Sequence, residues 1–242
     1  MTTASVPDTC LGVWRRALLR TPESEDTTSQ VFWLQTPRWH ADLRIPADRP
    51  PLSGARSLAE LGRGALLSLA SQQGFAGVTT VEGDLCRWHR HVDYQPPSGF
   101  EDVGRLEFES GDRLLEYGVQ QDYFEIWERL PGSVGPWAAL RQGDPPGTWL
   151  LRSGDFAMRV RPRAGLLGPA SSLAAWCAHL DLDEMRDRLD FEISLARVDA
   201  CGHWSISHST LPWLEGSPLE DAAVLSDDGP AAAEAAGWHA LG

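Results

Sequence analysis

The 242-residue sequence contains no lysine and no asparagine, so all 21 of its basic residues are arginines. The absence of lysine excludes Schiff-base enzymes and NTPases that depend on a P-loop lysine. The absence of asparagine excludes N-glycosylation sequons. With 34 acidic residues the formal net charge is -13, and no basic stripe is visible. We therefore expect no nucleic-acid partner, and any recognition of an anion must use arginine.

Cysteine and long apolar runs are also scarce. The four cysteines, Cys10, Cys86, Cys177 and Cys201, lie far apart and form no C-x-x-C pair. This spacing predicts reduced thiols rather than a zinc knuckle or a redox motif. The first eight residues lack the pattern of a signal peptide, and no run of about 18 apolar residues occurs, so we expect neither a signal peptide nor a membrane span. We expect a cytoplasmic protein with no membrane partner, and the composition is typical of a GC-rich bacterial genome.

Tryptophan is abundant, and its distribution predicts a fold made of strands. Most of the 11 tryptophans stand in short runs bounded by Gly, Pro or Asp. Gly83, Gly111 and Gly154 each stand in a short turn sequence, where a hairpin needs a positive φ. The predicted strands are 12–19, 31–36, 39–45, 74–82, 85–95, 103–109, 113–120, 123–130, 137–141, 148–152, 156–163, 190–198 and 203–210.

Two helical inserts interrupt these strands. The first is predicted over 57–73, with Ser57 as its N-cap, and the second runs from about 171 to 179 and continues at 183–188 behind Asp181. The chain lacks βαβ alternation and a G-x-G-x-x-G motif, which excludes a dinucleotide-binding fold. We predict an all-β, antiparallel, up-and-down barrel of about ten or more strands.

The domain prediction follows from the same pattern. Residues 1–216 are expected to form the barrel domain, with a division near 131–147 that would separate two barrel halves. Residues 217–242 form an acidic, Ala-rich tail, which we expect to be loosely attached.

Alternation within the strands identifies the side chains that face inward. In the predicted strand 85–95 the odd positions from Arg87 to Asp93 are all polar, so the even positions, which include Trp88, Arg90 and Tyr94, should face the interior. Arg90 is then a permanent cation among aromatic rings. For Asp42 and Arg44 we favour an exposed ion pair over a binding pair.

Carboxylates also fall on faces that should be apolar. Glu116 shares a face with Leu114, and either Glu125 or Glu128 must lie on the apolar face of its strand. A buried charge is costly unless it is paired. Such groups inside a hollow barrel would mark a ligand site.

One pattern resembles a metal site. His89 and His91 are two residues apart on a predicted strand, and His40, His203 or His208 could supply a third ligand. The same face carries other polar residues, so we favour a solvated strand face and predict no metal and no cofactor. Haem bound through His208 is an alternative. The sequence has no G-x-S-x-G elbow.

Several short motifs resemble those of a known family. Gly12-Val-Trp14 resembles the opening motif of lipocalins and other calycins, in which the tryptophan closes one end of the barrel. Further matches are Phe32–Thr36, Leu43–Pro46, Gly74–Gly77 and Phe124–Arg129. Together they are similar to a lipocalin-like family of bacterial and fungal cytoplasmic proteins, with a yeast member known to interact with a casein kinase. The resemblance implies a calycin barrel and brings no catalytic residues.

The leading hypothesis is a lipocalin-like binding protein for a small, mostly apolar ligand that carries an acidic or phenolic group. Arg90 would bind the anion, and aromatic side chains would supply contact area. The predicted ligand-binding residues are Trp33, Gln35, Trp88, Arg90, Tyr94, Tyr117, Glu125 and Trp127.

Two other hypotheses compete with binding. One is a cofactor-independent enzyme that uses Glu116 or Glu125 as a general base. The other is an interaction or scaffold protein with a packed barrel. The sequence is also compatible with a homodimer. A hollow interior of roughly 300 Å³ or more would favour binding or catalysis over the scaffold.

Overall fold

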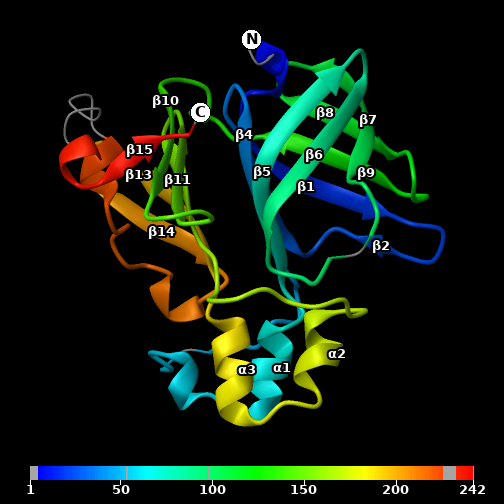
Figure 1. Cartoon of the computed structure of the whole chain (residues 1–242). Coiled ribbons are helices and arrows are strands. Elements are labelled where there is room, and N and C mark those ends of the chain that lie inside the picture. Colours follow the sequence, from blue (N-terminus) through cyan, green and yellow to red (C-terminus); the bar gives the residue numbers. More distant parts are fainter. Residues whose placement is uncertain (1–4, 53, 98, 226–232, 242) are drawn as a thin grey trace.

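The computed structural model describes residues 5–52, 54–97, 99–225 and 233–241, and it contains two antiparallel sheets with helices gathered at one end (Figure 1). The all-β prediction is confirmed. Eight strands form a meander that closes into a barrel because β9 pairs with β1. They are β1 Gly12–Arg20, β3 Gln30–Gln35, β4 Trp39–Ile45, β5 Gln73–Glu82, β6 Leu85–Asp93, β7 Val103–Ser110, β8 Arg113–Gly118 and β9 Phe124–Arg129. The short β2, Glu25–Asp26, extends β1.

The second sheet is open and has the strand order β14-β13-β12-β11-β10-β15. The chain enters it after residue 136, within the region where the sequence suggested a division. Its strands are β10 Trp137–Gln142, β11 Thr148–Ser153, β12 Phe156–Arg161, β13 Glu192–Val198, β14 Trp204–Ser209 and β15 Trp238–Ala240. All thirteen predicted strands are present, and only β2 and β15 were not predicted.

The helices are short. The α-helices are α1 Arg63–Leu69, α2 Leu173–Cys177 and α3 Leu182–Leu189, and the 3₁₀ turns are η1 Asp8–Cys10, η2 Leu58–Glu60, η3 Pro212–Leu214 and η4 Ala222–Leu225. Asp181 and Glu184 form a capping box at the start of α3, as the sequence indicated. Across the described ranges, no helix is long and apolar enough to cross a membrane.

The predicted 57–73 helix is shorter than expected. The extended backbone of Leu61 separates η2 from α1, and Gln73 already belongs to β5. Ser57 caps η2 without a side-chain hydrogen bond. Gly111, unlike Gly83 and Gly154, does not have a positive φ. It follows a bulge in β7, where the strand register shifts.

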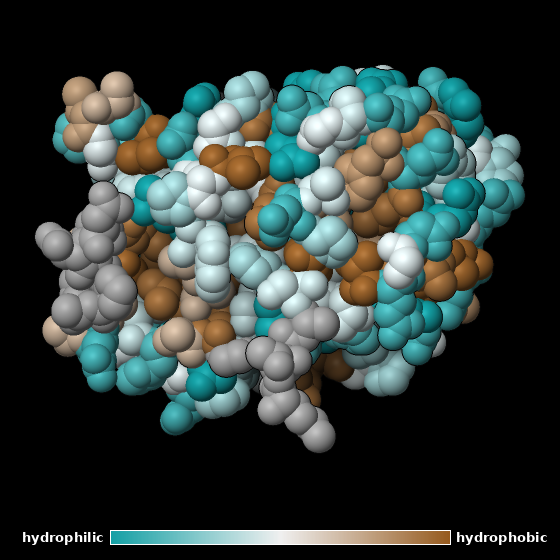
Figure 2. All heavy atoms as spheres, turned by 90° about the horizontal axis from the view of Figure 1, so that it is seen from above, coloured by the Kyte–Doolittle hydropathy of each residue, from teal (hydrophilic) through white to brown (hydrophobic). Residues whose placement is uncertain are grey.

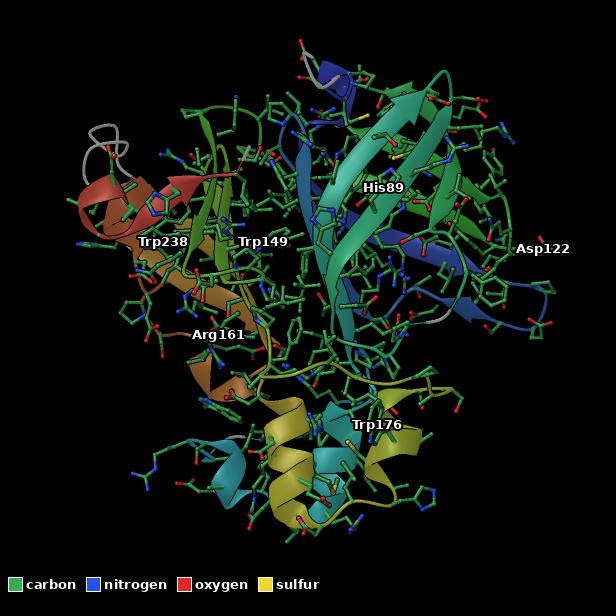
Figure 3. All side chains as sticks on the ribbon, in the orientation of Figure 1. His89, Asp122, Trp149, Arg161, Trp176 and Trp238 are labelled. Atoms are coloured by element: carbon green, nitrogen blue, oxygen red, sulfur yellow. The ribbon has the colours of Figure 1, made fainter. Side chains whose placement is uncertain are left out.

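The buried apolar residues form three clusters. One lies inside the barrel, one joins the barrel, the helices and the second sheet, and one covers the far side of that sheet. In the middle cluster the rings of Trp39 and Trp149 meet edge to face at 5.2 Å. Figure 3 shows Trp149 directed toward the barrel, with Trp238 on the opposite side of the second sheet. Part of the outer surface of the barrel is therefore buried against the second sheet and the helices.

The described part of the tail is attached, contrary to the expectation. Leu219, Val224 and Trp238 are buried, and β15 pairs with β10. These side chains cover apolar residues on the outer face of the second sheet, which explains their burial. Residues 226–232 and 242 lie outside the described residues.

Candidate ligand cavity inside the barrel

The barrel interior contains a cavity of about 420 Å³. One side is aromatic, with Trp33, Trp88, Trp127 and Phe75 among the lining residues. The ring centroid of Trp33 lies 5.5 Å from that of Trp88 and 6.1 Å from that of Trp127. Residues 170–172, which lead into α2, also line the cavity. The helical end of the molecule therefore covers its mouth.

The opposite end of the barrel is closed. Trp14 is fully buried, and its indole N–H donates to the carbonyl oxygen of Cys10 in η1 over 2.9 Å. The guanidinium of Arg129 lies 4.5 Å from the Trp14 ring centroid. The Gly12-x-Trp14 motif thus occupies the closed end, as the resemblance implied.

A bulge in β6 decides which side chains enter the cavity. Gly77 pairs with Arg90 and Ala76 pairs with Val92, so His91 is an extra residue in β6. A Cβ on Gly77 would lie only 1.8 Å from the carbonyl oxygen of His89, so this close approach requires glycine. Beyond the extra residue, the alternation of the strand is reversed.

This reversal corrects the prediction for Tyr94. Trp88 and Arg90, at even positions, precede the bulge and line the cavity. After the bulge the inward side chain is at an odd position, Asp93. Tyr94 packs in the cluster outside the barrel, 5.5 Å from the ring centroid of Phe191. Its hydroxyl donates to the carbonyl of Leu69. Tyr94 therefore does not line the cavity.

The other predicted residues divide into two groups. Trp33, Glu125 and Trp127 line the cavity together with Trp88 and Arg90. Gln35 is buried beside it, where its side-chain oxygen accepts hydrogen bonds from the Trp33 indole and from Thr79. Tyr117 does not line it. This residue pairs with Phe124 across the strands and lies under the guanidinium of Arg105, 4.3 Å from the ring centroid.

Arg90 is not a free cation. Its guanidinium lies 2.9 Å from Asp93 and 2.6 Å from Asp102, and its Cζ is 3.7 Å from the ring centroid of Phe75. The expected neighbours were Trp88 and Tyr94. Two carboxylates already neutralise Arg90, so it cannot bind an anionic ligand without releasing one of them.

The prediction that Asp42 and Arg44 form an exposed pair is wrong. The two side chains are bonded at 2.7 Å and both line the cavity, with Asp42 only 2 % exposed. In β4 the apolar residues Trp39, Ala41 and Leu43 face outward, because the second sheet and the helices cover that side of the barrel. The polar face of β4 therefore points inward.

Glu116 and Glu125 are both inside the barrel, opposite each other on β8 and β9. Glu125 forms an ion pair with Arg16 at 2.9 Å. Glu116 accepts hydrogen bonds from the Tyr123 hydroxyl at 2.7 Å and from the Trp127 indole at 3.0 Å. No ion pair found within the described residues includes Glu116.

The environment of this pair favours a proton on Glu116. Burial raises the pKa of Glu116 well above its usual range, and the nearby Glu125 carboxylate raises it further. Burial also raises the pKa of Glu125, but Arg44 and Arg16 oppose that shift. Gly104 leaves room for the Glu116 side chain, since a Cβ there would lie 2.8 Å from Glu116 Oε1. The two carboxyl groups therefore differ in their environment: Glu116 has neutral donors and Glu125 has a guanidinium partner.

The histidine pattern does not assemble a metal site. His89 is bonded to Thr80 on the outer wall, at 2.9 Å, whereas His91 packs against Trp39 and Trp149. The bulge accounts for this separation of the two rings. Where the chain is described, no group of three His, Cys, Asp or Glu side chains is arranged to hold a metal.

Sequence reasoning missed many residues of the cavity, among them Phe75, Asp93, Asp102 and Tyr123. Asp93 was assigned to the outer face because the bulge was not foreseen. Asp102 stands just before a predicted strand, where alternation gives no signal. Tyr123 falls in the predicted strand 123–130 on the same face as Glu125 and Trp127, so alternation could have identified it. The Gly74–Gly77 segment is one of the motifs of the family resemblance, but the sequence pattern does not show that Gly77 permits a bulge in the neighbouring strand.

Comparison with known proteins supports the fold alone. No family model matches the chain, and no curated protein matches it. An uncharacterized protein from Saccharomyces cerevisiae, YLR301w, has a similar structure, with a TM-score of 0.50, 10% identity, and coverage of 82% of this chain and 84% of that chain. A lipocalin-like protein from Bacteroides uniformis is matched over its full length and 51% of this chain, with a TM-score of 0.34 and 12% identity. The predicted antiparallel barrel is present as a closed meander of eight strands.

Proposed function

We propose that this protein binds a small organic molecule inside its barrel. The observation that carries the proposal is the cavity of about 420 Å³, which lies within the range of about 300–1,000 Å³ typical of small-molecule sites. A barrel that served only as a scaffold would gain stability from a filled interior. This barrel instead keeps buried carboxyl groups around an open space. Burying these groups costs stability, and a binding function would account for that cost.

The lining indicates a ligand with an aromatic or apolar body. Trp33, Trp88 and Trp127 supply a large contact area on one side. Charged groups stand next to these rings: Asp42 pairs with Trp33 across β3 and β4, and Glu116 accepts a hydrogen bond from the Trp127 indole. A ligand that matches this lining has a flat apolar body and a polar end directed to β8. An acidic end, the original expectation, does not match this wall.

A side opening offers an entry route. The pairing of β6 with β7 covers only three residue pairs and ends at Arg87 and Val103. Beyond this point a groove of about 530 Å³ lies outside the barrel, and it shares lining residues with the cavity. Arg90 and Asp102 are among the shared residues. Their ion pair stands between the groove and the cavity, so its opening would admit a ligand.

Two measurements test the proposal. Native mass spectrometry of the purified protein, with a thermal-shift screen of small aromatic and apolar compounds, should show a bound mass or a rise in Tm. Trp127→Ala should abolish the response, whereas the exposed Trp137→Ala should keep it. A library with no stabilising compound and a protein that carries no mass would refute cavity binding.

Catalysis is a second candidate because Glu116 and Glu125 share the inner wall. A protonated Glu116 beside an ionised Glu125 is the arrangement that separates an acid from a base. The scaffold hypothesis has less support. On the face in Figure 2, hydrophobic residues form separate patches among hydrophilic ones rather than one continuous apolar surface.

A further inference from the structure

The cavity holds more carboxyl groups than guanidinium groups. Two guanidinium groups line it, and a third, that of Arg16, pairs with Glu125 from the wall. The five lining carboxyl groups are Asp42, Asp93, Asp102, Glu116 and Glu125. Asp42 has Arg44, and Asp93 and Asp102 share Arg90. Glu116 is left with two neutral donors and no cation.

The surroundings of Glu116 suit a positive charge. The indole that donates to Glu116 belongs to Trp127, whose ring also meets Trp33 in the aromatic wall. The faces of indole rings attract cations, and the attraction strengthens where water is excluded. Each Glu116 oxygen accepts one hydrogen bond from the protein, which leaves a lone pair on each oxygen for a further donor.

We propose that the ligand is an organic cation, a protonated amine on an aromatic or apolar body, whose ammonium group binds Glu116. This inference rests on the proposed binding function. The ammonium group donates to the free lone pairs of the carboxylate, and the body of the ligand packs against the tryptophans. A ligand anion would instead face carboxyl groups that already outnumber the cations around them.

Binding should release a proton. In the empty cavity burial and Glu125 favour the protonated form of Glu116. When the ammonium group binds, the O–H bond of the carboxyl group breaks, the proton passes to water, and the carboxylate pairs with the cation. The other charged or titratable groups that face Glu116 are Cys86 of β6, Arg44 of β4, Glu125 of β9, and Asp102 and Tyr123 in the adjoining loops. Of these, Glu125 is already paired with Arg16, so Glu116 is the group that changes its protonation.

The experiment compares three probes of similar size: phenethylamine, phenethyl alcohol and phenylacetate. Isothermal titration calorimetry of the full chain should show the amine as the tightest binder. Glu116→Gln should weaken the amine by about tenfold or more, the loss of a charge-assisted contact, while the affinity of the alcohol is unchanged. The matched control is Glu107→Gln, an exposed carboxyl group on β7, which should leave the affinities of all three probes unchanged.

Three outcomes would overturn the inference. An alcohol or carboxylate that binds as tightly as the amine would exclude cation selectivity, and so would an amine affinity unaffected by Glu116→Gln. The third outcome needs no variant: titrations of the unmutated protein with amine, in buffers of different ionisation enthalpy, that show no proton release would also contradict the inference. The neutral dye N-phenylnaphthylamine separates the two proposals: if it binds and the amine does not compete, only the cation inference fails. If neither binds, the proposed function fails as well.

Discussion

Glu116 and Glu125 face each other across β8 and β9 inside the barrel, and only Glu125 has a guanidinium partner, Arg16 at 2.9 Å. Two buried carboxylates this close cannot both be ionised without a large cost. Tyr123 and Trp127 hold Glu116 with neutral donors instead. The pair therefore combines a carboxyl group that has an ion-pair partner with one that has only neutral donors, and this asymmetry underlies the ligand proposal.

Replacing Glu116 by Gln should change how stability depends on pH. Because the folded state raises the pKa of Glu116, its stabilising protonated form is fully present below the unfolded pKa of about 4.3. That contribution is lost as pH rises through the folded pKa. Gln keeps the shape and does not ionise, so the Tm of Glu116→Gln minus that of the unmutated protein should increase with pH. Calorimetry at about pH 5 and about pH 8 measures it, and a pH-independent difference would contradict the assignment.

Arg90→Met tests the corrected role of Arg90. The guanidinium neutralises Asp93 and Asp102 and is about one third exposed, so each ion pair should contribute no more than about 1 kcal/mol. Removing it should leave the fold intact and make the cavity more negative. Phenethylamine should then bind as tightly as before or more tightly. A loss of amine binding, measured by calorimetry, would mean that Arg90 itself contacts the ligand.

Gly104→Ala tests the space that Glu116 requires. The added methyl group would meet Glu116 Oε1 at 2.8 Å, and overpacking of this kind costs about 1–3 kcal/mol. Urea unfolding should report that loss, together with weaker binding of phenethylamine. The control is Gly111→Ala, where a Cβ meets nothing within 4 Å. Equal stability of the two variants would contradict the tight contact.

Trp149→Ala tests the docking of the second sheet on the barrel. Trp149 is 3% exposed and packs on Trp39, so its removal should cost about 3–5 kcal/mol. Trp137, also in the second sheet, is 56% exposed, and Trp137→Ala should change stability by less than about 0.5 kcal/mol. Denaturant unfolding of both variants decides the point. Similar losses would mean that this contact does not hold the sheet.

Much of the fold could be predicted from the sequence because its signals are local. Alternation and turn residues located thirteen strands, and Asp181 as a helix start located α3. The very short β2 and β15 carry no such pattern, since a pairing of two or three residues depends on the neighbouring strand. The extended backbone of Leu61 divides the predicted 57–73 helix into η2 and α1, and helix propensity did not reveal this break.

The site was less predictable because a strand pattern does not say which face is the interior. In β4 the apolar face packs outward under a second sheet that local sequence cannot reveal, and so Asp42 and Arg44 were assigned to the surface. In β6 a single extra residue, His91, exchanged the faces of Asp93 and Tyr94. Both errors have the same origin: the choice of face depends on tertiary contacts.

The most direct test of ligand binding inside the barrel is a titration of protein labelled with ¹⁵N in its indole groups. Phenethylamine should shift the indole N–H resonance of Trp127, which donates to Glu116 over 3.0 Å, and leave that of the exposed Trp137 unchanged. Glu116→Gln should reduce the Trp127 response at the same amine concentration. An unchanged Trp127 signal, with shifts confined to exposed tryptophans, would contradict the account.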